Sequence, residues 1–329
     1  MMDAETAELL AESLDRALRH ETAAAVEASL DEVGWREALE QEGAAVIPLL
    51  FTAQGAANAT SGALDDLVTA ALGSPAGPGT AFVLPRFGTY AVPGSVRNGG
   101  LALRGLGTVR MSSAARVLVV GEEDGALRAF VVETDRLETR PAGGVDPRLG
   151  LVTVEGRGIA VSGGAEVTAA AWENALSAGR VALAHELIGV SRTMLRLARE
   201  HAVTRIQFGR PIGSFQAVGH RLAESLVAIE SAEAAAAVAI EAAERDPTVQ
   251  VPALPAAMAK ALAGRNARTA ARHCQQLLAG VGFTDEHDFH HYFRRVLTLD
   301  GLLGGARTLT RELGEELLRT RRLPVAPPL

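Results

Sequence analysis

The chain has 329 residues, of which 48% are hydrophobic and 22% charged, a balance typical of a globular protein with a sizeable core rather than a disordered chain. A formal net charge of -7 argues against sequence-independent nucleic-acid binding, which needs a basic face, although it excludes no local basic pocket. No apolar run approaches the roughly 18 residues of a membrane span, and the acidic start lacks a signal-peptide pattern. We therefore expect a cytoplasmic protein that binds neither nucleic acid nor membrane.

The first part of the chain is predicted to be helical. Residues 4–42 carry leucines at helical spacings with charged residues between them, and Gly34 interrupts this pattern. Ser61 can cap a further helix over residues 64–72, and a linker rich in glycine and proline follows. We expect a small α-helical N-terminal domain over residues 1–78.

From residue 80 the sequence changes to short apolar runs separated by glycine-containing turns such as Asn98-Gly99-Gly100. The expected strands are Ala81–Leu84, Leu101–Leu106, Arg116–Val120, Ala129–Val132 and Leu151–Val154. These runs predict a small middle β domain over residues 79–168.

After Gly164 the chain returns to strong helix formers. The expected helices cover about residues 170–203, 214–245, 252–280 and 287–319. Four long helices with short connections favour an antiparallel four-helix bundle, which gives a third domain over residues 169–329. The last residues are rich in proline and are predicted to form a tail.

The most informative stretch is residues 204–216, which read TRIQFGRPIGSFQ. Its glycines and proline end one helix, and Ser214 can cap the next. The planar fork of Arg205 suits a phosphate because it can donate two charge-assisted hydrogen bonds, and Gln207 and Gln216 add neutral hydrogen-bonding groups. From residue chemistry alone, a tight helix–helix corner with surface arginines is an equal alternative.

A second glycine turn lies in residues 275–283, which read QQLLAGVGF. Gly280 and Gly282 let a ligand approach the backbone closely, but a simple helix C-cap explains the same residues. The single cysteine, Cys274, precedes this turn in a helical run. It is expected to be a small buried hydrophobic side chain.

A group of histidines follows at His287, His290 and His291, of which the first and last stand one helical turn apart. No third ligand is evident, so we expect no metal site and partly exposed surface histidines. Arg294 and Arg295 are likewise expected to be interface or solvent charges.

The two glycine-containing stretches resemble segments of the acyl-CoA dehydrogenase family, flavoproteins that desaturate acyl-CoA thioesters. Residues 204–216 closely resemble its RxQFGxPIGxFQ segment, and residues 275–283 resemble its QxxGGxGF segment, with Ala279 replacing a usual glycine. The resemblance implies the acyl-CoA dehydrogenase fold: an N-terminal α-helical domain, shorter here than usual, a middle β domain and a C-terminal four-helix bundle. In the family both segments contact the FAD of a neighbouring subunit. The FAD contacts implied here are Arg205, Gln207, Phe208, Gln216, Gln276 and Gly280.

The resemblance also implies a glutamate base, which the family places at one of two positions. These positions fall on Leu303 and Gly179, although the arginine that follows the second is retained as Arg180. Asp300, one turn before Leu303, is a weak substitute because proton transfer tolerates little displacement. We therefore expect no catalytic residue in this chain.

The middle domain departs from the family as well. In residues 81–95 there is no counterpart of the TEPxxGSD loop that lies along the flavin. Residues 107–113 take the place of the family's Trp-containing strand, with Arg110 or Met111 instead of the aromatic residue. The chain thus keeps the parts that serve a neighbour's FAD and lacks those that hold its own.

These features resemble the short subunits that form α2β2 tetramers acting on steroid-CoA side chains in actinobacteria. The implied partners are a paralogous catalytic subunit, a bulky acyl-CoA and an electron-transfer flavoprotein or similar acceptor. One alternative is a homo-oligomeric flavin oxidase or monooxygenase, which needs no base but does need flavin-ring contacts. A second alternative, a cofactor-free scaffold, would have no use for Arg205 or Gln276.

Overall fold

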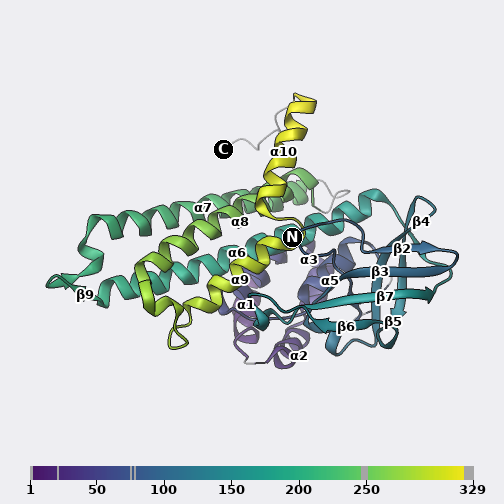
Figure 1. The fold of residues 1–329 in the computed structure, drawn as a ribbon, viewed down its shortest axis with the longest axis horizontal. Coiled ribbons are helices and arrows are strands. Elements are labelled where there is room, and N and C mark those ends of the chain that lie inside the picture. Colours follow the sequence, from purple (N-terminus) through teal and green to yellow (C-terminus); the bar gives the residue numbers. More distant parts are fainter. Residues whose placement is uncertain (1–2, 21, 75, 78, 246–250, 322–329) are drawn as a thin grey trace.

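The computed structural model describes residues 3–20, 22–74, 76–77, 79–245 and 251–321. Its elements follow the predicted order of helices, then a sheet, then long helices (Figure 1). The helices of the N-terminal region are α1 (Ala4–Ala17), α2 (Ala23–Val33), α3 (Trp35–Glu42), α4 (Ile47–Ala57) and α5 (Ala63–Ala71). The predicted break at Gly34 occurs because that residue adopts φ 77°, a left-handed conformation that glycine allows without strain.

The strands are β1 (Ala81–Phe82), β2 (Gly94–Arg97), β3 (Gly100–Gly107), β4 (Arg116–Glu123), β5 (Ala126–Glu133), β6 (Glu138–Pro141), β7 (Val152–Ala160) and β8 (Ala165–Val167). They form one sheet in the order β6-β7-β3-β2-β4-β5-β8, and β1 pairs in parallel with β4. The sequence patterns missed β2, β6 and β8. These strands are short, and every residue of β6 is exposed, so they carry little apolar signal.

The C-terminal helices are α6 (Ala169–Thr204), α7 (Gln216–Arg245), α8 (Ala253–Leu278), α9 (Phe289–Gly301) and α10 (Ala306–Thr320). Helix α6 lies at the centre and packs closely on α4. A methyl group at Gly55 would come within 2.0 Å of Glu186 O, and one at Gly189 within 2.0 Å of Thr52 O. Only glycine at these two positions lets the two helix backbones approach so closely.

The fourth predicted helix is wrong as a single element, because the chain breaks it between α9 and α10. Leu303 has φ 54° and Gly304 has φ 101°, so the backbone leaves the right-handed helix there. Asp300 Oδ1 accepts the N–H of Ala306 at 3.0 Å and thereby starts α10. Figure 1 shows α10 standing away from the other four helices.

A buried ion network ties the three regions together at Arg295, which was expected to be a solvent or interface charge. Its side chain is fully buried and donates to Asp146 at 2.6 Å and to Glu186 at 3.1 Å. It also donates to the carbonyl of Ala59 at 2.8 Å. Burial raises the pKa of Glu186 even against the pull of Arg295. Removing either partner would leave a buried charge unpaired, so this arginine is structural.

Candidate cofactor and active-site regions

The first predicted cofactor segment is a tight corner between α6 and α7. Strands β9 (Ile206–Gln207) and β10 (Arg210–Pro211) pair through a turn in which Phe208 has φ 52°. A 3-10 turn (Ile212–Ser214) follows. Ser214 donates its hydroxyl to Pro211 O at 2.7 Å and lies before α7, so its predicted capping role is wrong.

A pocket of about 370 Å³ brings together three of the predicted cofactor residues, Gln207, Phe208 and Gln276. The Phe208 ring is 91% exposed and meets Phe215 edge to face at a centroid distance of 6.0 Å. Left-handed backbone is uncommon for a bulky residue, and exposing its ring does nothing for the core. Most of the Phe208 ring is thus left on the surface of this corner.

Arg205, Gln216 and Gly280 are not among the lining residues of that pocket. All three are exposed, and each lies within a few residues of a lining residue in the sequence. Within the part of the chain that the structure describes, the guanidinium of Arg205 makes no ion pair or hydrogen bond. A methyl group at Gly280 would meet no atom within 4 Å, so its backbone is open to approach. In the described structure the guanidinium of Arg205 is therefore available to a ligand.

These residues lie far from the chain's own sheet. Figure 1 places β9 at one end of the long axis and the β-sheet at the other. Ile206 of the first segment and Phe283 of the second are 62% and 69% exposed. The predicted cofactor face thus lies open at the surface of the described structure and combines exposed apolar side chains with arginine and glutamine.

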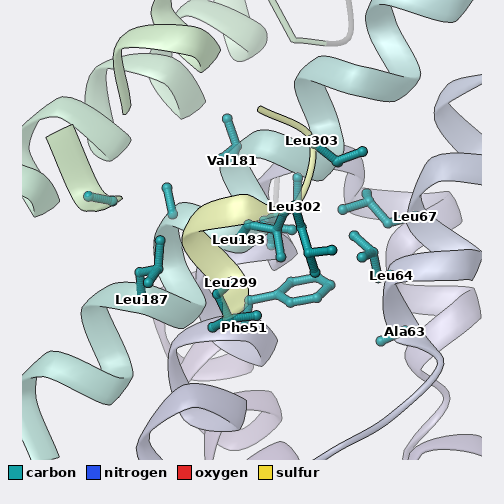
Figure 2. Close-up of a cluster of buried hydrophobic side chains, with 14 of the residues drawn as sticks. Phe51, Ala63, Leu64, Leu67, Val181, Leu183, Leu187, Leu299, Leu302 and Leu303 are labelled. Atoms are coloured by element: carbon teal, nitrogen blue, oxygen red, sulfur yellow. The ribbon is translucent and has the colours of Figure 1, made fainter. Parts of the chain in front are cut away.

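The two family positions for a glutamate base lie against one another. A methyl group at Gly179 would come within 2.5 Å of Leu303 Cδ1, so the leucine side chain fills the space beside this glycine. Leu303 is buried, and Figure 2 shows it beside Leu64 and Leu67 of α5. The place where a carboxylate is expected is therefore part of the hydrophobic core.

Arg180, the retained arginine, is held by this chain's own groups. Its Nε donates to Leu303 O at 3.2 Å, and its terminal nitrogen donates to Glu173 at 3.1 Å. The guanidinium also lies 4.8 Å from the centroid of the Tyr90 ring.

Asp300, the weak candidate base, is already occupied. Its Oδ1 accepts from Ala306 N, and its Oδ2 accepts from Arg268 Nε at 2.6 Å. Lys260, which is fully buried, donates to the backbone oxygen of the same aspartate at 2.9 Å. These contacts make Asp300 a capping and ion-pairing residue at the α9–α10 break.

The loop between β1 and β2 crosses from the sheet to that break. The Phe87 ring lies against Gly301, where a methyl group would come within 2.0 Å, and Gly88 N–H donates to Gly301 O at 2.9 Å. Tyr90 donates its hydroxyl to Glu312 of α10 at 2.8 Å. The segment that was expected to lack a flavin-ring motif is instead anchored on the chain's own helices.

The expected replacement of the Trp-containing strand is also corrected. Strand β3 ends at Gly107, and a 3-10 turn (Val109–Ser112) follows. Arg110 is buried and forms ion pairs with Asp66 and with Glu27, the latter at 2.8 Å. Although burial opposes its charge, hydrogen bonding to Asp66 raises the pKa of Arg110. This arginine ties the sheet to α5 and α2.

The histidine group also differs from expectation, because His290 is buried rather than partly exposed. Its Nδ1 lies 2.8 Å from His287 O, and His287 Nδ1 accepts from Phe289 N at 3.1 Å. Among the described residues, no group of three His, Cys, Asp or Glu side chains could hold a metal. Cys274 is buried, as predicted, and burial raises the pKa of its thiol to about 12.

Known proteins resemble the chain in two ways. A sequence profile described as "Acyl-CoA dehydrogenase, C-terminal domain" matches residues 169–318. The chain is 42% identical over 124 residues to the acyl-CoA dehydrogenase FadE34 of Mycobacterium tuberculosis, which covers 38% of this chain and 17% of that protein. It is 40% identical over 137 residues to the acyl-CoA dehydrogenase IpdE2 of the same organism, covering 42% and 41% of the two chains.

Solved structures match over nearly the full length. A chain of the ChsE4-ChsE5 complex from Mycobacterium tuberculosis gives a TM-score of 0.81 at 22% identity, covering 98% of this chain and 99% of that one. Butyryl-CoA dehydrogenase from Megasphaera elsdenii gives a TM-score of 0.73 at 16% identity, covering 97% of this chain and 100% of that one. Thus the chain has the acyl-CoA dehydrogenase fold.

Residues 169–318 belong to the acyl-CoA dehydrogenase C-terminal domain family, which confirms the resemblance predicted from the two glycine-containing segments. The chain spans less than half the length of these curated relatives. In the described ranges, no helix combines the length and apolarity needed to cross a bilayer.

Proposed function

We propose that this chain is the non-catalytic subunit of a heteromeric, FAD-dependent acyl-CoA dehydrogenase. It would complete the FAD site of a paralogous partner, which supplies the glutamate base and the flavin-ring loop. The reaction is α,β-desaturation of an acyl-CoA, with an electron-transfer flavoprotein or similar acceptor taking up the electrons.

One observation carries this proposal: the corner with the predicted FAD contacts is exposed, whereas the place expected for the catalytic carboxylate is filled by Leu303. Arg205, Gln207 and Phe208 are exposed at the end of the bundle. At the other location, Leu303 occupies the space beside Gly179. A subunit with its own active site would need a cavity and a carboxylate there.

The exposed residues suit FAD by their chemistry. Arg205 would donate to the pyrophosphate, Gln207, Gln216 and Gln276 would offer hydrogen bonds, and Phe208 an apolar face. The open backbone at Gly280 would allow close approach. When bound, FAD supplies the hydride acceptor of the reaction, and this chain's contribution is to bind and orient it.

A bulky substrate and a heteromeric assembly are supported by similarity. Two matching structures are described as the ChsE4-ChsE5 complex and a Tcur3481-Tcur3483 steroid acyl-CoA dehydrogenase variant, the latter with a TM-score of 0.78 at 22% identity. We propose a steroid side-chain or similarly bulky CoA ester as substrate. Losing one of two active sites would leave room for such a ring system.

The other two functions fit less well. A homo-oligomeric flavin oxidase would need its own flavin-ring contacts, yet Phe87 and Tyr90 anchor that loop on α9 and α10. A cofactor-free scaffold would have no reason to keep the Arg205 guanidinium, which has no partner among the described residues, beside an exposed ring at Phe208.

The test is to purify the chain alone and after co-expression with acyl-CoA dehydrogenase paralogues from the same organism, and to record flavin absorbance. We expect little or no FAD with the chain alone and a flavin-containing complex with one paralogue. A yellow homo-oligomer with stoichiometric FAD would reject the heteromer and favour the oxidase alternative.

A further inference from the structure

A second cavity, of about 970 Å³, lies between α8, α9 and α10. Its apolar floor includes Phe293 and Leu297. Five of its lining residues are arginines, and one is an aspartate: Arg265, Arg268, Arg272, Arg307, Arg311 and Asp300. We call this cavity the arginine groove. Its positive charge contrasts with the net charge of -7 of the whole chain.

The charges of the arginine groove are only partly balanced within the chain. Arg268 pairs with Asp300 at 2.6 Å, and Arg311 lies 3.7 Å from Glu312. Among the described residues, no carboxylate lies within 4.0 Å of Arg272 or Arg307. Like charges one turn apart on a helix repel, so this arrangement costs stability unless an anion is bound.

The arginine groove continues the face that carries the predicted cofactor residue of α8. Arg265, Thr269, Arg272 and Gln276 are spaced by four, three and four residues, which places them on one side of the helix. Gln276 lines the pocket beside Phe208. A partner that covers Gln276 therefore extends naturally toward Arg272, and α10 stands out from the bundle beside this face (Figure 1).

We propose that the arginine groove is the docking site for an acidic, amphipathic segment of the paralogous partner subunit. Carboxylates of that segment would pair with Arg272 and Arg307, and its apolar side chains would pack on Phe293 and Leu297. This inference rests on the proposed heteromeric function. It goes beyond that function by naming the surface, and the charge on it, that would select the partner.

The experiment uses the co-expressed complex and the double variant Arg272→Glu/Arg307→Glu. These two arginines are chosen because their reversal breaks no ion pair among the described residues. The subunit Kd and the FAD content per complex are measured at low and high salt. We expect the double variant to raise the Kd by at least about tenfold at low salt, since opposed like charges are strongly unfavourable. The Kd of the wild-type complex should rise with salt, and that of the variant should rise less.

The matched control is Arg97→Glu/Arg157→Glu, which reverses two exposed arginines of the sheet and should leave the Kd unchanged. An unchanged Kd and salt dependence in the groove variant, with normal FAD content, would overturn the docking site and leave the proposed function intact. If wild type forms no flavin-containing complex with any paralogue, both fail. Hexyl phosphate provides a further probe of the uncomplexed chain. Micromolar binding that the groove variant abolishes would assign the groove to a small organic phosphate and overturn partner docking.

Discussion

Arg205 is exposed, and its guanidinium has no partner in the described part of the chain, so its removal should spare the fold and weaken cofactor binding. We expect Arg205→Ala to cost about 1.5–3 kcal/mol of FAD binding in the complex, roughly a tenfold to hundredfold rise in Kd. The measurement is FAD titration of the apo complex, with thermal unfolding of the chain in parallel. Arg199→Ala, which removes another exposed arginine near the end of α6, is the control and should leave FAD binding unchanged. A lowered melting temperature with unchanged FAD affinity would make Arg205 structural instead.

Gly179 and Leu303 should behave as a coupled pair, because the Leu303 side chain occupies the space that a side chain at position 179 would need. Leu303→Ala should destabilise the chain by about 2–5 kcal/mol through the cavity it creates. Gly179→Ala should cost about 1 kcal/mol in the wild-type chain, where overpacking exceeds the gain in helix propensity. In the Leu303→Ala background the same change should stabilise, since the new methyl group enters the vacated space.

The measurement for this pair is the free energy of unfolding by denaturant for the four members of the cycle. We expect a coupling of at least about 1 kcal/mol. Additive effects would show that the two positions are not packed together, and would remove the argument that the base position is filled.

At the residue scale, what the sequence could predict depended on whether a residue acts locally. Gln207 and Phe208 sit in a contiguous string, and their exposure follows from a turn between two helices. Arg110 and Arg295 find their partners on distant elements, so nothing near them in the sequence distinguishes a buried ion pair from a solvent charge. Burial of an arginine with its partners leaves no local pattern.

At the scale of elements, the contact between α4 and α6 predicts a dependence of stability on pH. His185 of α6 lies 3.4 Å from the Thr52 hydroxyl, and its Nε2 has no partner within the described structure. Burial lowers the pKa of His185 from 6.5 to about 4. The folded chain therefore keeps the ring neutral, while the unfolded chain takes up a proton below about pH 6.5. This contribution to stability is complete above about pH 6.5 and is lost as the pH falls toward 4.

Asp65 acts in the opposite direction over part of the same range. Burial raises its pKa from 3.8 to about 6, so its contribution to stability is present at low pH and is lost as the pH rises through 6. The contribution of His185 to stability must therefore be measured as the difference between the wild-type chain and a variant without the imidazole. Between about pH 7 and about pH 4.5, the wild-type chain should lose about 2 kcal/mol relative to His185→Leu, measured by denaturant unfolding. Parallel curves for the two proteins would contradict a buried neutral imidazole.

The break between α9 and α10 explains why helix length was overestimated. Apolar residues continue at helical spacing from Leu299 through Leu302 to Leu309, so the hydrophobic pattern gives no stop. The stop comes from the Gly304–Gly305 pair and from the Asp300 side chain, which caps the next helix. Short, exposed strands such as β6 are missed for the opposite reason, because they lack an apolar pattern altogether.

At the scale of the whole molecule, the order of helices, sheet and bundle was predictable because each region has its own periodicity over many residues. The filling of the candidate active site by a side chain was not predictable. Leu303 and Gly179 are remote in sequence, and only folding reveals that one side chain fills the space beside the other. The opposite placement of β9 and the sheet likewise follows from the length of α6, which carries the corner away from the β region (Figure 1).

The chain contains a single lysine and a single cysteine, Lys260 and Cys274, and both lie fully buried on α8. While the bundle is closed, reagents that attack side-chain amines or thiols find no target here. The same reagents become reporters once α8 separates from its neighbours, so the rate of labelling counts opening events of the bundle. In a mixed assembly, any lysine side chain that reacts rapidly would belong to the other subunit. Because both residues are buried, the folded chain does not react with lysine- or cysteine-directed reagents. Labelling of a mixed assembly would therefore identify the exposed lysines and cysteines of the partner without any mutation of this chain.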